Sequence, residues 1–175
     1  MTTEERSRLE AIDRIVRSNE VRREIQPIIE RVSKKLASNS HSVMAWEPIP
    51  LEIFGRGLPE SIRSGWIFIL RRGADTGPER HPNSHQRMLT LSGTGDMRTK
   101  QRRAWKSNIL RSNRNARLRQ RWVSIPQNTW HQPVVGAESD WAVISFHTVP
   151  AEELIEERPG PSTASANQQM KYLDA

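Results

Sequence analysis

Apolar positions near the N-terminus recur at helical spacing. They fall three and four residues apart, at Leu9, Ile12, Val16, Ile25, Ile28, Ile29, Val32 and Leu36. Thr2 and Glu5 are spaced as in a capping box, and Ser18-Asn19 offers a break in the pattern. Pro27 fits the first turn of a helix better than a helix interior. We therefore predict two or three amphipathic helices that pack on the rest of the domain or on a partner chain.

From residue 65 onward the pattern changes to short apolar runs that are rich in β-branched and aromatic residues and separated by Gly, Pro and Asn. These runs predict strands at 65–70, 87–91, 119–125 and 141–149. Short strands without intervening helices indicate a mainly β fold, either an antiparallel sandwich or a barrel. The Pro-, Ser- and Gly-containing segment 158–175 predicts a flexible C-terminal tail.

The composition limits the chemistry. A length of 175 residues fits one domain with an appendage. We expect an N-terminal helical extension at 1–40, a β domain at 41–157 and a tail at 158–175. The chain has no cysteine, which excludes disulfides, thiol catalysis and cysteine-ligated metal sites. Any metal must be held by histidine, carboxylate or amide oxygen.

The net charge of +7 comes from one segment. Between residues 98 and 121 there are ten bases and no acid, at Arg98, Lys100, Arg102, Arg103, Lys106, Arg111, Arg114, Arg117, Arg119 and Arg121. Basic residues that alternate along strands usually form a solvated face or pair with acids, such as those in 152–157. No nucleic-acid motif accompanies the segment, so nucleic acid is the less favoured partner.

The chain has no run of about 18 apolar residues, which a membrane helix needs, and its N-terminus lacks the apolar run of a secretory signal. We therefore expect a cytoplasmic protein that does not bind a membrane.

Candidate metal ligands lie close together in the segment 79–86. Pro82 favours an extended backbone at His81. An extended segment places Glu79 and His81 on the same face, because side chains alternate along a strand. This is a chelating arrangement. His85 and Gln86 are adjacent and face opposite sides, so we expect only one of them to join the first two residues.

A second candidate stretch ends in a histidine that begins a predicted strand, His131. With it, the sequence resembles the cupin superfamily. The first cupin motif matches as Gly73, five residues, Glu79-x-His81, four residues, Gln86, six residues and Gly93; the second matches as Pro126-x-Asn128-x-x-His131. Glu79 stands where the family has a first histidine, Gln86 where it has a glutamate, and Asn128 where it has a glycine. Gln120 and Val135 stand at the outer Gly and Asn positions of the second motif.

The resemblance covers residues 65–150 and implies a single antiparallel cupin-like β-barrel of the jelly-roll type. It also implies that Glu79, His81, Gln86 and His131 face a common interior and hold a metal. Gln86 and His85 are alternatives for the last position. Cupin-like barrels commonly pair, so we expect a homodimer.

One carboxylate and two imidazoles form the ligand set of non-haem Fe(II) oxygenases, and Mn, Ni, Co or Zn would also fit. The leading interpretation is a metal-dependent enzyme that acts on a small molecule, with dioxygenase as the first reaction class and isomerase as the second. The alternative is a non-catalytic sensor or binding module, with a regulatory role.

The remaining histidines and the tryptophans have simpler interpretations. We expect His147 to be structural or to line the pocket, and His41 to be solvated. Trp66, Trp122 and Trp141 are expected in the core. Trp130 precedes His131 and should face the outer side of the fold.

Overall fold

A computed structural model describes residues 1–113, 115–161 and 166–174 of the chain. Within them the α-helices are α1 (Thr3–Val16) and α2 (Asn19–Ser38), and short 3-10 helices occur at Leu51–Gly57, Leu118–Gln120, Ala151–Glu153 and Tyr172–Asp174. The strands are β1 (Met44–Pro48), β2 (Ser64–Leu70), β3 (Gln86–Ser92), β4 (Thr94–Gln101), β5 (Ala104–Lys106), β6 (Ile109–Arg111), β7 (Trp122–Ile125), β8 (His131–Val135), β9 (Trp141–His147), β10 (Ile155–Arg158) and β11 (Gln168–Lys171). Arg114 of the basic segment, and residues 162–165 and 175 of the expected tail, lie outside the described residues.

The N-terminal helices are capped as the sequence predicts. The Thr2 hydroxyl accepts a hydrogen bond from the Glu5 backbone N–H at 3.2 Å, and Ser18 caps α2 in the same way. The expectation for Pro27 was wrong, because α2 runs through it without a break. Buried Ile25 and Ile28 flank the proline and anchor the helix on the sheet, which outweighs the missing backbone hydrogen bond.

The described strands form two larger sheets and a two-stranded sheet of β10 and β11. The first has the order β1-β2-β9-β3-β7, and the second has the order β5-β4-β6 with β8 also paired to β4. All pairs between the described strands are antiparallel, which confirms the mainly β fold class. The run at 119–125 becomes a strand only from Trp122, because residues 118–120 form a 3-10 turn.

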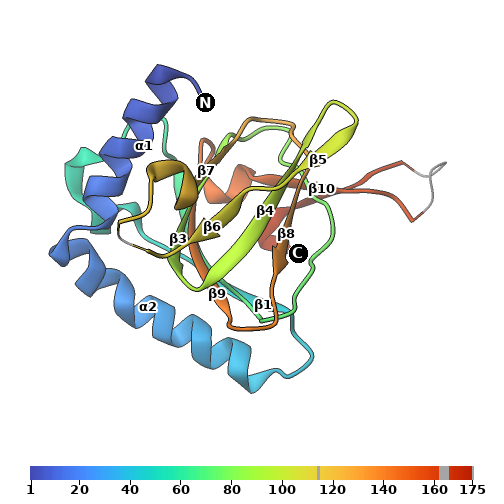
Figure 1. Cartoon of the computed structure of the whole chain (residues 1–175), viewed down its shortest axis with the longest axis horizontal. Coiled ribbons are helices and arrows are strands. Elements are labelled where there is room, and N and C mark those ends of the chain that lie inside the picture. Colours follow the sequence, from blue (N-terminus) through green and yellow to red (C-terminus); the bar gives the residue numbers. More distant parts are fainter. Residues whose placement is uncertain (114, 162–165, 175) are drawn as a thin grey trace.

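The first sheet is covered on both faces, so its central strand β9 is buried throughout. Ile144 and Phe146 pack with the apolar faces of α1 and α2, whereas Trp141 and Val143 pack between the two sheets. Figure 1 shows the helices gathered on one side of the strands. Gly95 of β4 lies directly against Trp141, where an added Cβ would come within 2.2 Å of the ring. The sheets therefore enclose a packed interior at this end.

The C-terminal segment differs from the tail that we expected. Residues Gln168–Lys171 form β11 and pair with β10, and Tyr172 is buried among Trp46, Trp66 and Phe68. The four residues of β11 show too little alternation of apolar and polar side chains to predict a strand after the Pro- and Ser-rich residues that precede them. In the described part of the chain, neither helix has the length and apolar character that crossing a membrane would require.

Candidate metal centre

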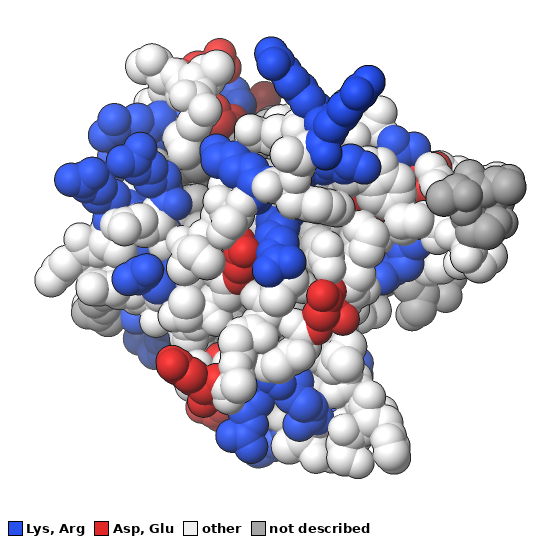
Figure 2. Space-filling model, turned by 45° about the vertical axis from the view of Figure 1, so that its right-hand side comes forward, with Lys and Arg blue, Asp and Glu red and all other residues white. Residues whose placement is uncertain are grey.

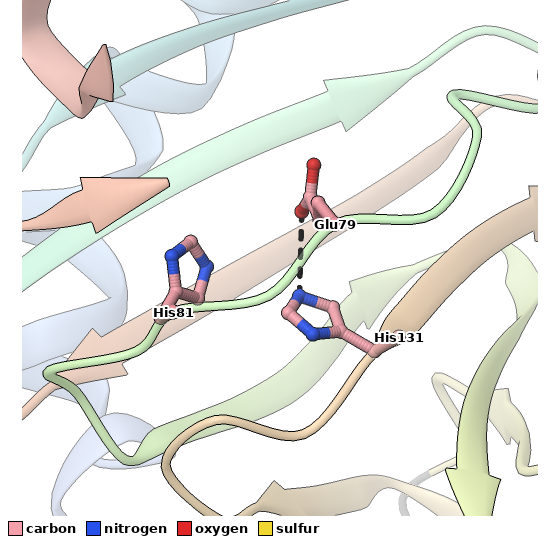
Figure 3. A group of neighbouring side chains, drawn as sticks. All are labelled: Glu79, His81 and His131. Atoms are coloured by element: carbon pink, nitrogen blue, oxygen red, sulfur yellow. Dashed lines mark ion pairs between the residues drawn. The ribbon is translucent and has the colours of Figure 1, made fainter. Parts of the chain in front are cut away.

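Two neighbouring segments bring Glu79, His81 and His131 together. Glu79 and His131 exchange two backbone hydrogen bonds of 2.8 Å, and the His81 carbonyl accepts one from the Asn128 N–H at 2.9 Å. Asn128 has a φ of 63°, a conformation that asparagine tolerates better than most residues. Glu79 and His81 are two residues apart on one extended segment, with His131 on the other (Figure 3). One ligand atom from each of the three residues lies within 4.8 Å of the others.

Backbone carbonyls fix both imidazole rings. Nδ1 of His81 donates to the Ile155 carbonyl, and Nδ1 of His131 donates to the Thr129 carbonyl, each at 3.0 Å. When an imidazole is neutral and its proton is on Nδ1, Nε2 keeps its lone pair. His131 is fully buried and His81 is 4% exposed. The fold therefore turns Nε2 of both rings toward a site shielded from water.

Glu79 and His131 face each other at a short distance. Glu79 Oε1 lies 3.3 Å from His131 Nε2, and this buried nitrogen has no hydrogen-bond partner among the described residues. Two buried lone pairs repel each other unless a positive charge lies between them. The pair therefore requires a cation, either a shared proton or a metal ion that displaces the proton.

The pKa values follow from burial and from the neighbouring charges. Burial, followed by the charge on His131, lowers the pKa of His81 from 6.5 to about 4, so His81 is neutral at pH 7. Burial alone would raise the pKa of Glu79, but a hydrogen bond and the charge from His131 when its Nε2 carries a proton, followed by the charges of His81 and Arg158, outweigh it and hold this pKa below 4.5. Glu79 is therefore a carboxylate, which is the form that a metal ligand needs.

Arg158 holds the second oxygen of Glu79. Its Nη2 donates to Glu79 Oε2 at 2.9 Å, its Nε donates to buried Glu156 at 2.7 Å, and its Nη1 donates to the Thr76 carbonyl at 2.8 Å. Oε1 is left facing His131. Sequence reasoning missed Arg158 because it placed this residue in a tail. The alternation of Leu154, Glu156 and Arg158 on one face of β10 was the available signal.

Gln86 lies on the interior side of the first sheet, where it pairs in register with His147. Its side-chain nitrogen donates to Ser145 Oγ at 2.9 Å, and its Oε1 is buried without a partner among the described residues. The two ring nitrogens of His147 lie 3.1 Å from Ser145 Oγ and 3.3 Å from Ser84 Oγ. Both nitrogens of His147 thus have hydroxyl neighbours, whereas the amide oxygen of Gln86 has no partner among the described residues.

His85 lies on the opposite side of the sheet, apart from the cluster. Its Nε2 is 2.7 Å from Ser124 Oγ and 3.6 Å from the Glu5 carboxylate of α1. Adjacent strand residues face opposite sides, so placing Gln86 inward turns His85 outward. The structure thus corrects the alternative in which His85 joins Glu79 and His81.

The donor set fits a divalent transition metal. It offers two neutral imidazole nitrogens and one carboxylate oxygen. Metal-binding histidines typically donate their other N–H to a carbonyl or carboxylate, as His81 and His131 do here.

Solved structures share the architecture that holds this site. CapF bound to the inhibitor 3-isopropenyl-tropolone superposes with a TM-score of 0.50 at 14% identity, over 66% of this chain and 31% of that chain. CapF is a cupin-fold protein. This chain has a cupin-like fold. Two further cupin-fold structures are similar at lower scores. Oxalate decarboxylase from Lactobacillus farciminis, in a formate complex, has a TM-score of 0.48 at 12% identity over 64% of this chain and 30% of that chain. KdgF from Halomonas sp. has a TM-score of 0.44 at 12% identity over 63% of this chain and 84% of that chain.

The extent of these likenesses is limited to the fold. The cupin-like chain spans less than a third of the CapF and oxalate decarboxylase chains that it matches. No protein-family model and no curated protein matches its sequence.

Proposed function

We propose that this chain is a metal-dependent, cupin-like enzyme that acts on a small molecule, with Glu79, His81 and His131 as its metal ligands. The observation that carries the proposal is the buried 3.3 Å contact between Glu79 Oε1 and His131 Nε2, which needs a cation, either a proton or a metal ion. Three protein ligands leave coordination positions open for a substrate. We place dioxygenase first and isomerase second as the reaction class, and Fe, Mn, Ni or Zn as the metal.

When bound, the metal would supply a Lewis acid that polarises a substrate oxygen and, as iron, a redox centre for O₂ chemistry. The chain's own residues orient the ligands. Arg158 binds Oε2 of Glu79 and so leaves Oε1 as the coordinating atom. The Thr129 and Ile155 carbonyls hold the two rings with Nε2 inward.

Other side chains exclude water from the site. The Tyr172 ring, itself buried, lies 6.2 Å from the His81 ring and covers this side of the cluster. The Glu79 side chain is 13% exposed, whereas both histidines are more deeply buried. We therefore expect a small substrate to approach from the side of Glu79. Gln86 Oε1, buried without a partner, is placed either to complete the metal ligands or to accept a hydrogen bond from the substrate.

Turnover in metal-loaded protein tests this proposal. Protein loaded anaerobically with Fe(II), Mn(II), Ni(II) or Zn(II) is incubated with a panel of small metabolites, and O₂ uptake and product masses are recorded. His131→Ala should abolish metal-dependent turnover. His41→Ala, a change at an exposed histidine, should leave it intact. Equal turnover in both variants would contradict the proposal.

The alternative is a non-catalytic binding module, and a specific contact favours it. Arg158 already neutralises part of the Glu79 charge, so the cluster is stabilised without a metal. In that case a small ligand would raise the melting temperature equally in metal-loaded and chelator-treated protein, with no turnover. The homodimer and the cytoplasmic location are still predictions from the sequence.

A further inference from the structure

The outward face of the second sheet combines basic and aromatic residues. On β4 the side chains alternate: Met97 and Thr99 are buried, whereas Arg98 and Lys100 are exposed. Lys100 pairs in register with Trp105 of β5. These residues therefore lie side by side and point away from the metal centre.

A second tryptophan lies on the other side of Lys100. The Lys100 backbone N–H donates to the Trp130 carbonyl at 2.8 Å, directly before the pairing of His131 with Thr99. Since His131 faces inward, Trp130 faces outward, as the sequence predicts. The Arg80 guanidinium stacks over the Trp130 ring at 4.7 Å.

Most of the positive charge on this face has no acidic partner. Lys100, Arg102, Arg103 and Lys106 are exposed, and in the described part of the chain none of them pairs with a carboxylate. Two of the four acids that we expected to balance the basic segment pair elsewhere. Glu156 and Glu157 pair with the arginines at positions 158 and 80. Figure 2 shows basic side chains projecting at the top of the molecule, where the hairpin of β4 and β5 lies in Figure 1, with few acidic side chains around them.

The tryptophans distinguish this face from an ordinary solvated one. Trp105 is 41% exposed, although tryptophan is usually well buried. It belongs to β5 and Trp130 to the segment before β8, so the backbones that carry the two rings lie on either side of Lys100, about two strand spacings or roughly 10 Å apart. Aromatic rings on either side of a basic residue suit single-stranded nucleic acid, because its bases can stack on the rings while its phosphates bind the basic side chains.

We propose that this face, made by Lys100, Arg102, Arg103, Trp105 and Trp130, binds single-stranded nucleic acid. A duplex keeps its bases stacked inside and offers the tryptophans nothing to stack on. An anionic membrane would attract the same charges without requiring the rings to flank Lys100. The site is separate from the metal centre, since neighbouring residues on β4 and β8 point to opposite sides of the sheet.

Fluorescence anisotropy with a fluorescein-labelled 20-nucleotide oligo(dT) tests the proposal on the full chain. We expect binding at 50 mM salt that weakens as salt rises. For each phosphate contacted, the slope of log K against the logarithm of the salt concentration should be about −0.7. Trp105→Ala should weaken binding about fivefold or more and leave the salt slope unchanged. Lys100→Gln should reduce the slope by about 0.7. Lys34→Gln, on exposed α2 surface, should change neither value.

Three results would overturn the proposal. The first is no binding at 50 mM salt. The second is equal affinity for a 20-base-pair duplex with no effect of Trp105→Ala, which would indicate charge attraction alone. The third is tighter binding to phosphatidylserine vesicles than to the oligonucleotide. All substitutions are at exposed or half-buried positions, so circular dichroism melts should show each variant folded. Treatment with a chelator should leave oligonucleotide binding unchanged, which separates this proposal from the metal centre.

Discussion

Two carboxylates, Glu5 under helix α1 and Glu79 in the candidate metal centre, have different surroundings. On the sheet face toward α1, Glu5 accepts hydrogen bonds from Arg87 at 2.7 and 2.9 Å and a third from Ser124. In the candidate metal centre, Glu79 Oε1 lies 3.3 Å from His131 Nε2, a buried nitrogen without a hydrogen-bond partner among the described residues. A carboxylate with all its partners fastens a helix to a sheet. A carboxylate beside an unpaired lone pair marks a place for a cation. The atom without a partner beside Glu5 is a donor, Arg87 Nη1, whereas the one beside Glu79 is a ring nitrogen that can bind a cation, and this difference separates the candidate site from the structural ion pair.

The largest effect on stability should come from the helix-facing side. Asp13 of α1 accepts hydrogen bonds from Arg121, at 3.0 Å from Nη2, and from the Trp122 indole at 2.8 Å. Asp13→Ala would leave a buried guanidinium without its partner, which costs about 3–5 kcal/mol of unfolding free energy. Urea titration measures this loss. Glu10→Ala, on an exposed part of the same helix, should change the free energy by about 0.5 kcal/mol or less. Equal losses in the two variants would contradict the comparison.

A smaller effect is expected from a charge placed on the interior face. Gln86→Glu restores the carboxylate of the cupin motif but buries it without a cationic partner, which should destabilise the metal-free protein by about 1–3 kcal/mol. A divalent metal should then raise the melting temperature of Gln86→Glu by more than that of the wild type. Gln101→Glu, an exposed change, serves as the control. If metal stabilises Gln86→Glu no more than the wild type, Gln86 does not reach the metal.

The smallest expected effect is the acid sensitivity of the helix-facing ion pairs. Burial would raise the pKa values of Glu5 and Asp13, but hydrogen bonds from Arg87, Arg121 and their neighbours outweigh it and hold both below their usual 4.5 and 3.8. The unfolded chain therefore takes up protons first as pH falls. Stability from these pairs is complete above about pH 4.5 and is lost as pH falls through the folded-state pKa values. Urea titrations across this pH range should show that the unfolding free energy of Asp13→Asn falls less steeply with decreasing pH than that of the wild type. Parallel pH curves for variant and wild type would contradict the assignment.

Much of the fold could be predicted from the sequence, because the spacing of apolar residues in a long run distinguishes a helix from a strand. The helical spacing of Leu9 and Ile12, and the apolar run that begins at Trp141, correspond to α1 and β9. The C-terminal hairpin could not be predicted, because β11 is short and polar and is held chiefly by the burial of Tyr172.

The candidate site was partly predictable for a related reason. Spacing placed Glu79 and His81 on one face, and the cupin resemblance added His131. Spacing alone left His85 and Gln86 as alternatives, because the strand register sets which side each residue faces. Arg158 lies 79 positions from Glu79 along the chain, so no local pattern links the two residues.

The most direct test of the account is the metal content of three proteins expressed without a histidine tag: wild type, His81→Ala and His85→Ala. The two histidines are four positions apart and lie on opposite sides of the sheet. After loading with a divalent metal and desalting, elemental analysis should find about one ion per chain in the wild type and in His85→Ala, and none in His81→Ala. The same metal content in all three proteins, or no metal in any of them, would contradict a metal centre at Glu79, His81 and His131.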